Sequence, residues 1–502
     1  MRRGINSPRQ GKNQAMKTSE LISRIKSDFH DSGDLLVREI TRDGVSCCFC
    51  YVDGLSDKML LEQDVIAPVS DRGELFRGQL LSADRLREIL LETTSFCQDI
   101  ILMNYEEGKA KIAEGDVGFF LDGQEGFCMF SMRKFEKRAI AEPPTATVLK
   151  GPREGFIEEI KINTTLIRRR IKSPDLVFEN FSVGRYSSTP VSVAYIHGVA
   201  DPETVREVRE RLQAIDIDGV IDSAYVANFL ETRRYSLFKQ IGNSEKPDVV
   251  AAKLLEGRIA VIVDGSPIVL TLPFIMLEDM QDGYDYYSDD WRATFARCFR
   301  MMGALLTVLL PAAYVALQSY HYHLLPIKFL ITLVNATNAI PFPPAVEMLF
   351  VLLLFEILNE ASIRMPRYLG ISLSIVGAIV LGDTAVKAGL ISSPAVLVVA
   401  LSSIGVFCVP DQVGTLSIFR LAFLLASAVL GLFGIIILLL CTLSYLATLQ
   451  SYGAPYLAPY APRIFPDLKD GFVKQATADM TKRPYSISTA NRTRMRKEDF
   501  ND

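Results

Sequence analysis

A long apolar stretch constrains this chain more than any other feature of its sequence. From Phe299 to Leu449 the chain is dominated by Leu, Ile, Val, Ala, Phe and Gly, and charge is concentrated toward the two ends. The overall composition, 49% hydrophobic and 22% charged, resembles a soluble protein only because it averages these regions. One bilayer crossing takes about 20 apolar residues. The sequence therefore predicts a soluble N-terminal α/β region of two subdomains, followed by an all-α polytopic membrane domain.

The chain divides by composition into five parts. The first residues are polar and basic and lack the apolar core of a signal peptide, so we expect the soluble region to stay in the cytosol. Pro143-Pro144 favours extended chain and marks a boundary. We expect a disordered N-terminus at 1–17, cytosolic α/β subdomains at 18–141 and 142–290, a membrane domain at 291–449, and a cytosolic basic tail at 450–502 with a disordered end.

Turn and cap signals predict the elements of the soluble region. Three Asp-Gly pairs, at 43–44, 122–123 and 264–265, each lie between two apolar runs and predict hairpins. Asp201-Pro202 is a typical helix start. The expected helices are Ala83–Leu91, Pro152–Ile171, the segment after Pro202, and Pro247–Leu255. The arginines Arg168–Arg170 end one of them, and we favour a solvated face for these side chains over contact with anionic lipid or a partner.

The apolar region contains segments of unequal length. Three are long enough to span, namely Phe299–Ser319, Tyr368–Leu390 and Ile418–Leu446, whereas Leu324–Ile340, Pro344–Leu358 and Ala395–Val409 are shorter. Both chain ends are expected inside, the tail because it is basic, which requires an even number of crossings. We expect about four to six crossings with re-entrant pieces. The prolines around Phe342 interrupt any helix, so this stretch should be buried against neighbours, at a membrane surface or in a cavity.

The sequence lacks the common motifs of catalytic and nucleotide-binding sites. It has no phosphate-binding Gly-rich loop, no dinucleotide fingerprint and no His-Glu-x-x-His pair. The net charge of −4 argues against a nucleic-acid partner. We therefore expect no enzyme activity, no catalytic residue, no cofactor and no metal.

Ionisable residues inside the apolar region are more informative. A charge in the membrane is costly, so such residues usually face a pore, a cavity or a partner. Six residues qualify: Glu347, Glu356, Glu360, Asp383, Lys387 and Arg420. The spacing of Glu360 and Arg364, and of Asp383 and Lys387, suits i, i+4 ion pairs. The alternative is that these are interfacial or packing charges near helix ends.

Several motifs together resemble a known family, the A subunits of the GerA spore germination nutrient receptors. In the soluble region they are Lys150–Phe156, Asn163–Lys172, Asp216–Ser223, Glu245–Val250, Leu254–Arg258 and Val263–Pro267. In the apolar region they are Leu309–Leu317, Pro341–Pro343, Phe355–Leu358, Ser374–Gly382 and Ser451–Pro459. The stretch Val409–Gly414 departs from the more usual Pro-Asn-Tyr pattern. The resemblance covers nearly everything from about residue 30 onward.

The resemblance implies a receptor subunit in the inner membrane of a bacterial spore. Its partners would be a transporter-like, nutrient-binding B subunit and a lipoprotein C subunit, and A subunits would form a homo-oligomeric ring around a cation channel gated by nutrient. A non-conducting scaffold that couples the nutrient-binding partner to germination is the alternative, and a secondary transporter is a weaker one.

If the chain forms a channel, Tyr368–Leu390 is the expected pore helix. Small residues at Gly370, Ser374 and Gly377 form a stripe that permits close packing. Val376 and Ile379 would form a hydrophobic constriction. Asp383 would attract cations just beyond it. The alternative is that the small residues only pack helices within one subunit.

Overall fold

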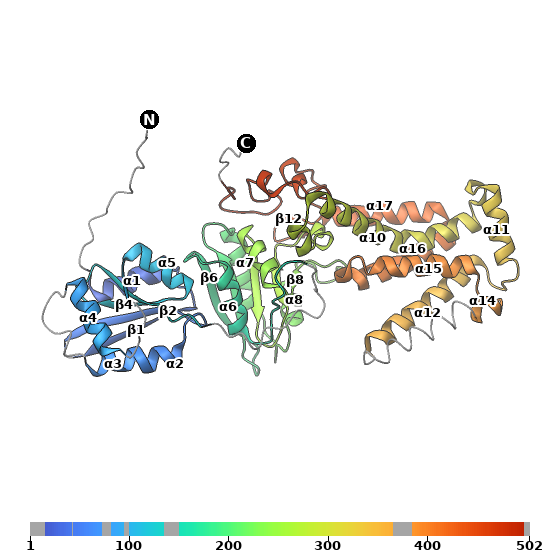
Figure 1. The fold of residues 1–502 in the computed structure, drawn as a ribbon. Coiled ribbons are helices and arrows are strands. Elements are labelled where there is room, and N and C mark those ends of the chain that lie inside the picture. Colours follow the sequence, from blue (N-terminus) through green and yellow to red (C-terminus); the bar gives the residue numbers. More distant parts are fainter. Residues whose placement is uncertain are drawn as a thin grey trace, which may run out of the picture. The chain divides into compact units, whose positions relative to one another are not determined.

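The computed structural model describes residues 16–42, 44–72, 82–94, 100–134, 150–364 and 384–495 (Figure 1). Contacts divide the chain into two compact units. The first unit comprises residues 1–232, 241–273 and 481–502, and the second unit comprises residues 233–240 and 274–480. The first unit contains two five-stranded sheets, and the second unit consists mainly of helices.

The first sheet has the order β1-β2-β4-β5-β3 and helices on both faces. Its strands are β1 (Leu35–Arg42), β2 (Val45–Val52), β3 (Ile101–Asn104), β4 (Val117–Leu121) and β5 (Gly126–Phe130). The helices α1 (Thr18–Asp28) and α5 (Tyr105–Glu114) cover one face. The other face carries the π-helix η1 (Leu61–Ile66), α3 (Ala67–Asp71) and α4 (Ala83–Thr93). Because successive residues of a strand point to opposite faces, Cys47, Phe49 and Tyr51 enter one core and Cys48, Cys50 and Val52 the other.

The second sheet repeats this arrangement, with the order β6-β7-β9-β10-β8. Its strands are β6 (Leu176–Val183), β7 (Thr189–Ile196), β8 (Gly242–Ser244), β9 (Ile259–Val263) and β10 (Val269–Leu272). In both sheets the order is first, second, fourth, fifth and third strand, and all pairings are antiparallel. The helices α6 (Ile160–Arg170) and α9 (Pro247–Leu255) share one core with the sheet, and α7 (Pro202–Gln213) and α8 (Ser223–Leu230) contact strands β6 and β10.

Most local predictions for this region are confirmed. The three predicted hairpins pair as β1–β2, β4–β5 and β9–β10. Asp201 caps α7 by accepting a hydrogen bond from the Thr204 amide, and Val205, Val208 and Leu212 are buried on one stripe. The helix predicted from Pro152 is too long, because α6 begins only at Ile160. Before it, the Phe156 amide donates to the Glu245 carbonyl and the Ile157 amide to the Asn163 side chain, bonds that hold this segment outside the helix.

The expected solvated face for Arg168 is wrong. Its side chain is 1% exposed and donates to both carboxylate oxygens of Asp34, with both Nε–Oδ2 and Nη2–Oδ1 distances at 2.8 Å. Arg168 also donates to the carbonyls of Ser173 and Leu176. Asp34 comes from the start of the first sheet, so this buried pair joins the two sheets within the first unit.

The second unit is built around the 30-residue helix α10 (Asp290–Ser319), which packs along α15 (Ser393–Val406) and α16 (Val413–Leu430). Figure 1 shows these helices side by side with α17 (Leu432–Thr448). The other α-helices in the described part of this unit are α11 (Ile327–Thr337), α12 (Pro344–Arg364) and the short α14 (Ala385–Lys387). Among the described residues, α10 and the segment Pro410–Leu430 are long and apolar enough to cross a membrane, and α11, α15 and α17 are shorter apolar helices.

One prediction for the apolar region is wrong in detail. The single span predicted at Ile418–Leu446 consists of two helices, α16 and α17, separated by Gly431. Phe342 is 43% exposed within this chain, and its expected place against neighbours, at a membrane surface or in a cavity stays a prediction. Of the predicted span Tyr368–Leu390, residues 368–383 lie outside the described part. The end of that span is α14 followed by a turn with Gly389 at a φ of 68°.

Part of the tail folds back on the first unit. After the two-residue strands β11 (Gln450–Ser451) and β12 (Ala454–Pro455), residues 481–495 belong to the first unit. Ile487 is fully buried, and the Ala490 amide donates to the Val199 carbonyl.

Candidate functional site

The helical unit contains a buried arginine that joins three helices. Arg420 on α16 is fully buried and forms an ion pair with Glu356 on α12, whose side chain is 33% exposed. The Arg420 Nη1 atom also lies 3.2 Å from Ser402 Oγ and 3.3 Å from Ser403 Oγ, both on α15. Its Nε atom lacks a hydrogen-bond partner among the described residues. Arg420 therefore holds α12, α15 and α16 together through charge-assisted bonds.

The same site continues from α15 to α10. The Ser402 hydroxyl donates to the Thr307 carbonyl at 2.8 Å, and the Thr307 hydroxyl donates to the Ser402 carbonyl at 3.0 Å. This reciprocal pair requires the two backbones to lie close together. A Cβ at Gly405 would lie 2.6 Å from both the Gly303 carbonyl oxygen and Thr307 Oγ1, so two facing glycines permit the approach.

A second buried carboxylate joins α12 to α15. Glu347, in the first turn of α12, is 1% exposed and accepts a hydrogen bond of 2.5 Å from the Ser392 amide. Ser392 is the N-cap residue of α15 and its hydroxyl accepts from the Ala395 amide. The N-terminal end of a helix carries partial positive charge, which stabilises a carboxylate placed there. Glu347 thus acts as an additional cap for α15.

The remaining predicted charges divide into two groups. Glu360 and Arg364 form the ion pair expected from their spacing, at 2.6 Å, and both side chains are exposed. Lys387 lies in α14, but its expected partner Asp383 is outside the described residues. The pore candidates Gly370, Ser374, Val376, Gly377, Ile379 and Asp383 also lie in 365–383, outside the described part of the chain.

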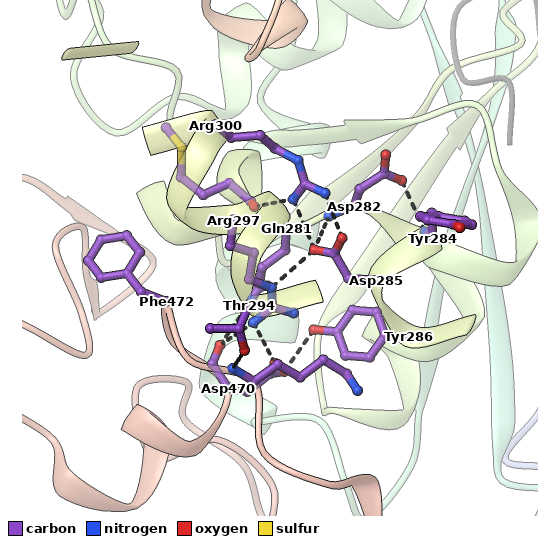
Figure 2. A network of polar contacts seen from close by, with 12 residues as sticks. Gln281, Asp282, Tyr284, Asp285, Tyr286, Thr294, Arg297, Arg300, Asp470 and Phe472 are labelled. Carbon is purple, nitrogen blue, oxygen red and sulfur yellow. Dashed lines mark hydrogen bonds and ion pairs between the residues drawn. The ribbon is translucent and has the colours of Figure 1, made fainter. Parts of the chain in front are cut away.

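A network of arginines and aspartates surrounds the start of α10, and sequence reasoning missed it (Figure 2). Asp285, in the 3₁₀-helix η4 (Gly283–Tyr287), is fully buried. It accepts from Arg297 Nε at 3.0 Å and from Arg300 Nη2 at 2.5 Å. Burial alone would raise the pKa of the Asp285 carboxyl, but the bonds and charges of Arg300 and Arg297 outweigh burial and hold this pKa below its usual value.

The network also fixes the chain that follows the helices. Arg297 Nη1 donates to the Asp470 carboxylate at 2.9 Å and to the Gly471 carbonyl at 2.7 Å. The Tyr286 hydroxyl and the Gln281 side chain bond to Asp470 as well (Figure 2). Farther along, Lys474 pairs with Asp290, and its amide donates to the Thr294 hydroxyl. The segment 470–474 is therefore bound to the first turns of α10.

A third polar cluster lies around Asp279 in the 3₁₀-helix η3 (Met276–Met280). Its carboxylate accepts from Lys239 at 3.3 Å and from the Gln412 side chain at 2.5 Å. Lys239 belongs to the inserted segment 233–240, and Gln412 to the 3₁₀-helix η7 (Pro410–Gln412) that precedes α16. Burial raises the pKa of Asp279 despite Lys239 and Gln412. The only sequence signal for these clusters is the acidic and aromatic run before α10, next to Arg297 and Arg300.

The charged side chains of these clusters lie between helices and do not surround a space for a substrate. Among the described residues, no group of three or more His, Cys, Asp or Glu side chains is placed to hold a metal ion. The charged side chains bond to each other, to serine and threonine hydroxyls and to backbone carbonyls. The two long apolar helices among the described residues, together with the two-sheet α/β region, indicate a membrane protein with a large soluble region.

Comparisons with known proteins place this membrane protein in a family. The family model described as Bacillus/Clostridium GerA spore germination protein matches residues 23–486. Spore germination protein KA of Bacillus subtilis is 34% identical, with 95% of this chain and 88% of the relative covered. Spore germination protein GerLA of Bacillus cereus is 32% identical, with 95% and 97% covered. The uncharacterized membrane protein YfkQ of Bacillus subtilis is 36% identical, with 91% and 89% covered.

A solved structure is also similar. The N-terminal domain of the A subunit of the Bacillus megaterium spore germinant receptor GerK3 is 28% identical to this chain. The match covers 53% of this chain and all of that domain, with a TM-score of 0.42.

The chain belongs to the GerA family of spore germination proteins, as an A subunit of a germinant receptor. This is a family of receptor subunits and not an enzyme family, and its members are membrane proteins that work in receptor complexes. The resemblance found in the sequence motifs is thereby confirmed.

Proposed function

We propose that copies of this chain form a nutrient-gated cation channel in the inner membrane of the spore. The proposed partners are a transporter-like B subunit that binds the nutrient and a lipoprotein C subunit, and the α/β region lies on the cytosolic side. The observation that carries the proposal is the buried Arg420 with its partner Glu356 and its serine and threonine neighbours, inside helices that are mainly apolar. Ionisable groups in a membrane interior are costly and are usually retained for function.

The position of this polar site along the chain supports a role in gating. The proposed pore helix, Tyr368–Leu390, follows α12 and precedes α15. Arg420 binds both flanking helices, and Glu347 joins them a second time. A shift of α12 against α15 would therefore be transmitted directly to both ends of the proposed pore segment.

Ion release from vesicles tests the proposal at the pore residues. Full-length protein is reconstituted with its proposed B and C partners into vesicles loaded with potassium, and release is measured with and without nutrient. Val376→Ser and Ile379→Ser should release potassium without nutrient, because a polar side chain weakens a constriction that closes by dewetting. Asp383→Asn should reduce cation flux.

The outcome also separates the channel from its alternative. If the Val376 and Ile379 variants behave as wild type and Asp383→Asn leaves flux unchanged, this helix is not the pore. If wild-type vesicles release no potassium under any condition, the chain acts as a non-conducting scaffold that couples a nutrient-binding partner to germination.

A further inference from the structure

An aromatic groove lies where the inserted segment 233–240 meets α16 and α17, all within the second unit. It has a volume of about 320 Å³ and is lined by Tyr235, Leu237, Phe238, Phe419, Cys441, Thr442 and Tyr445. The Phe238 ring is central, with centroid distances of 4.9 Å to Phe419 and 6.0 Å to Tyr445. Among the described residues, no acidic side chain lines the groove. Its lining is mainly aromatic, with one leucine, one cysteine and one threonine.

The helix that carries three of the groove residues also has an exposed apolar surface. Along α17, Phe433, Ile436, Ile437, Leu440 and Leu443 are between 46% and 70% exposed. Ile437 lies one helical turn before Cys441 of the groove, and the others lie on the more distant faces of the helix. In a membrane protein such a surface faces acyl chains or another protein, because water does not stabilise it.

The mouth of the groove is basic. Arg233 donates to the carbonyl of Thr448, the last residue of α17, at 3.0 Å, and its guanidinium lies 5.8 Å from the Tyr445 ring centroid. The next residue, Arg234, is exposed. Asp279 and Asp411 each lie 3.3 Å from Lys239, so these two carboxylates are paired with that lysine.

The aromatic groove, the apolar helix and the two arginines together fit one class of ligand. Tyrosines beside arginines at the end of an apolar helix are typical of the membrane–water interface. Arginines there attract anionic headgroups, at about 1 kcal/mol for each residue near the surface. We propose that the groove binds an anionic phospholipid, with its acyl chain in the groove against Leu237 and Tyr445 and its headgroup at Arg233 and Arg234. The proposal is independent of whether the chain conducts ions.

The tryptophan content of the chain makes a direct test practical. Its one tryptophan, Trp291, is 88% exposed, and Leu237 in the groove is 53% exposed, so Trp291→Phe and Leu237→Trp should both be tolerated. The full-length double variant is reconstituted in phosphatidylcholine vesicles that contain phosphatidylglycerol. Either lipid carries bromine on its acyl chains, and quenching of the tryptophan is compared. A matched control places the tryptophan at Val429, which is 72% exposed on α16 and outside the groove lining.

The expected result is preferential quenching at position 237 by brominated phosphatidylglycerol, with equal quenching by both lipids at position 429. Adding Arg233→Gln and Arg234→Gln should reduce the preference by about fivefold for each arginine removed. Equal quenching by both lipids at position 237, or a preference that survives loss of both arginines, would overturn the assignment. Absence of quenching at 237 by either lipid would overturn it too, because a protein surface would then cover the groove.

Discussion

Arg420 is the residue of the helical unit whose substitution we expect to lower the free energy of unfolding strongly. Removing one partner of a buried ion pair leaves an uncompensated charge, which costs roughly 3–5 kcal/mol. We expect Arg420→Met to lower the free energy of unfolding by about that amount and to shift thermal unfolding in detergent accordingly. The double variant with Glu356→Met should recover most of the loss, since neither charge then remains. Additive losses in the double variant would contradict coupling between the two residues.

A control for this series exists in the same unit. Lys239 and Asp411 lie 3.3 Å apart, and the Asp411 side chain is 51% exposed. Exposed pairs contribute between about 0 and 1 kcal/mol. Asp411→Asn should therefore leave the unfolding temperature nearly unchanged.

Asp285 makes the stability of the fold around the start of α10 depend on pH. Its pKa in the folded protein lies below the value of 3.8 expected for an unfolded aspartate. The ionised carboxylate therefore stabilises the fold fully above that value, and this stabilisation is lost as the pH falls through the lower, folded pKa. We expect Asp285→Asn to lower the unfolding temperature by a constant amount down to about pH 5, and the gap to wild type to shrink below about pH 4.

The measurement is thermal unfolding of both proteins across this pH range. Asp289→Asn is the control, because Asp289 is exposed and makes no side-chain cap bond, so it should have little effect at any pH. A gap that widens on acidification would show that the Asp285 charge does not stabilise the fold.

Single residues were predictable from sequence only where the partner is close along the chain. The i, i+4 spacing of Glu360 and Arg364 was enough to predict their pair. Arg420 was recognised as an intramembrane charge, but Glu356 is 64 residues away, so nothing in the spacing identified it as the partner. The burial of Arg168 could not be predicted, because its partner Asp34 lies 134 residues away, just before strand β1.

At the scale of elements, Gly431 decides how the last apolar stretch folds. Its φ of 61° and ψ of −139° lie where only glycine is readily accommodated, and a Cβ there would lie 3.0 Å from the Tyr320 side chain. We expect Gly431→Ala to lower stability by roughly 1–3 kcal/mol, measured by thermal unfolding.

Gly414 is a matched control for this substitution. It lies in the first turn of α16, and a Cβ there would meet nothing within 4 Å. Gly414→Ala should be neutral or slightly stabilising, because alanine is a better helix former by about 1 kcal/mol. Equal effects of the two substitutions would argue against a helix break that requires glycine.

Sequence patterns predicted the strands well and the apolar helices less well. Asp-Gly turns between apolar runs gave the three hairpins nearly to the residue. Apart from Arg420, the run from Ile418 to Leu446 is almost entirely apolar, so no periodicity reveals where one helix ends and the next begins. A glycine within such a run is compatible with a continuous helix, and only the structure, in which Phe423 and Ile435 share one core, makes the break visible.

At the scale of the whole molecule, each folded unit contains a segment that is separated in sequence from the rest of that unit. Residues 233–240 leave the second sheet region to join the helical unit, and residues 481–495 return to the first unit. A boundary drawn along the sequence cannot represent such an exchange, because each segment is stabilised by contacts far away in the chain. The predicted division at residues 290 and 450 is drawn along the sequence, and it assigns neither segment to the unit that the segment joins.

Single-channel recording shows whether copies of this chain conduct cations. Purified full-length protein is reconstituted in a planar bilayer with its proposed B and C partners, and nutrient is added. We expect discrete, cation-selective openings that depend on nutrient, and lower cation conductance in Asp383→Asn. A bilayer that stays electrically silent with nutrient, while the complex is shown to be intact and nutrient-bound, would rule out a channel formed by this chain.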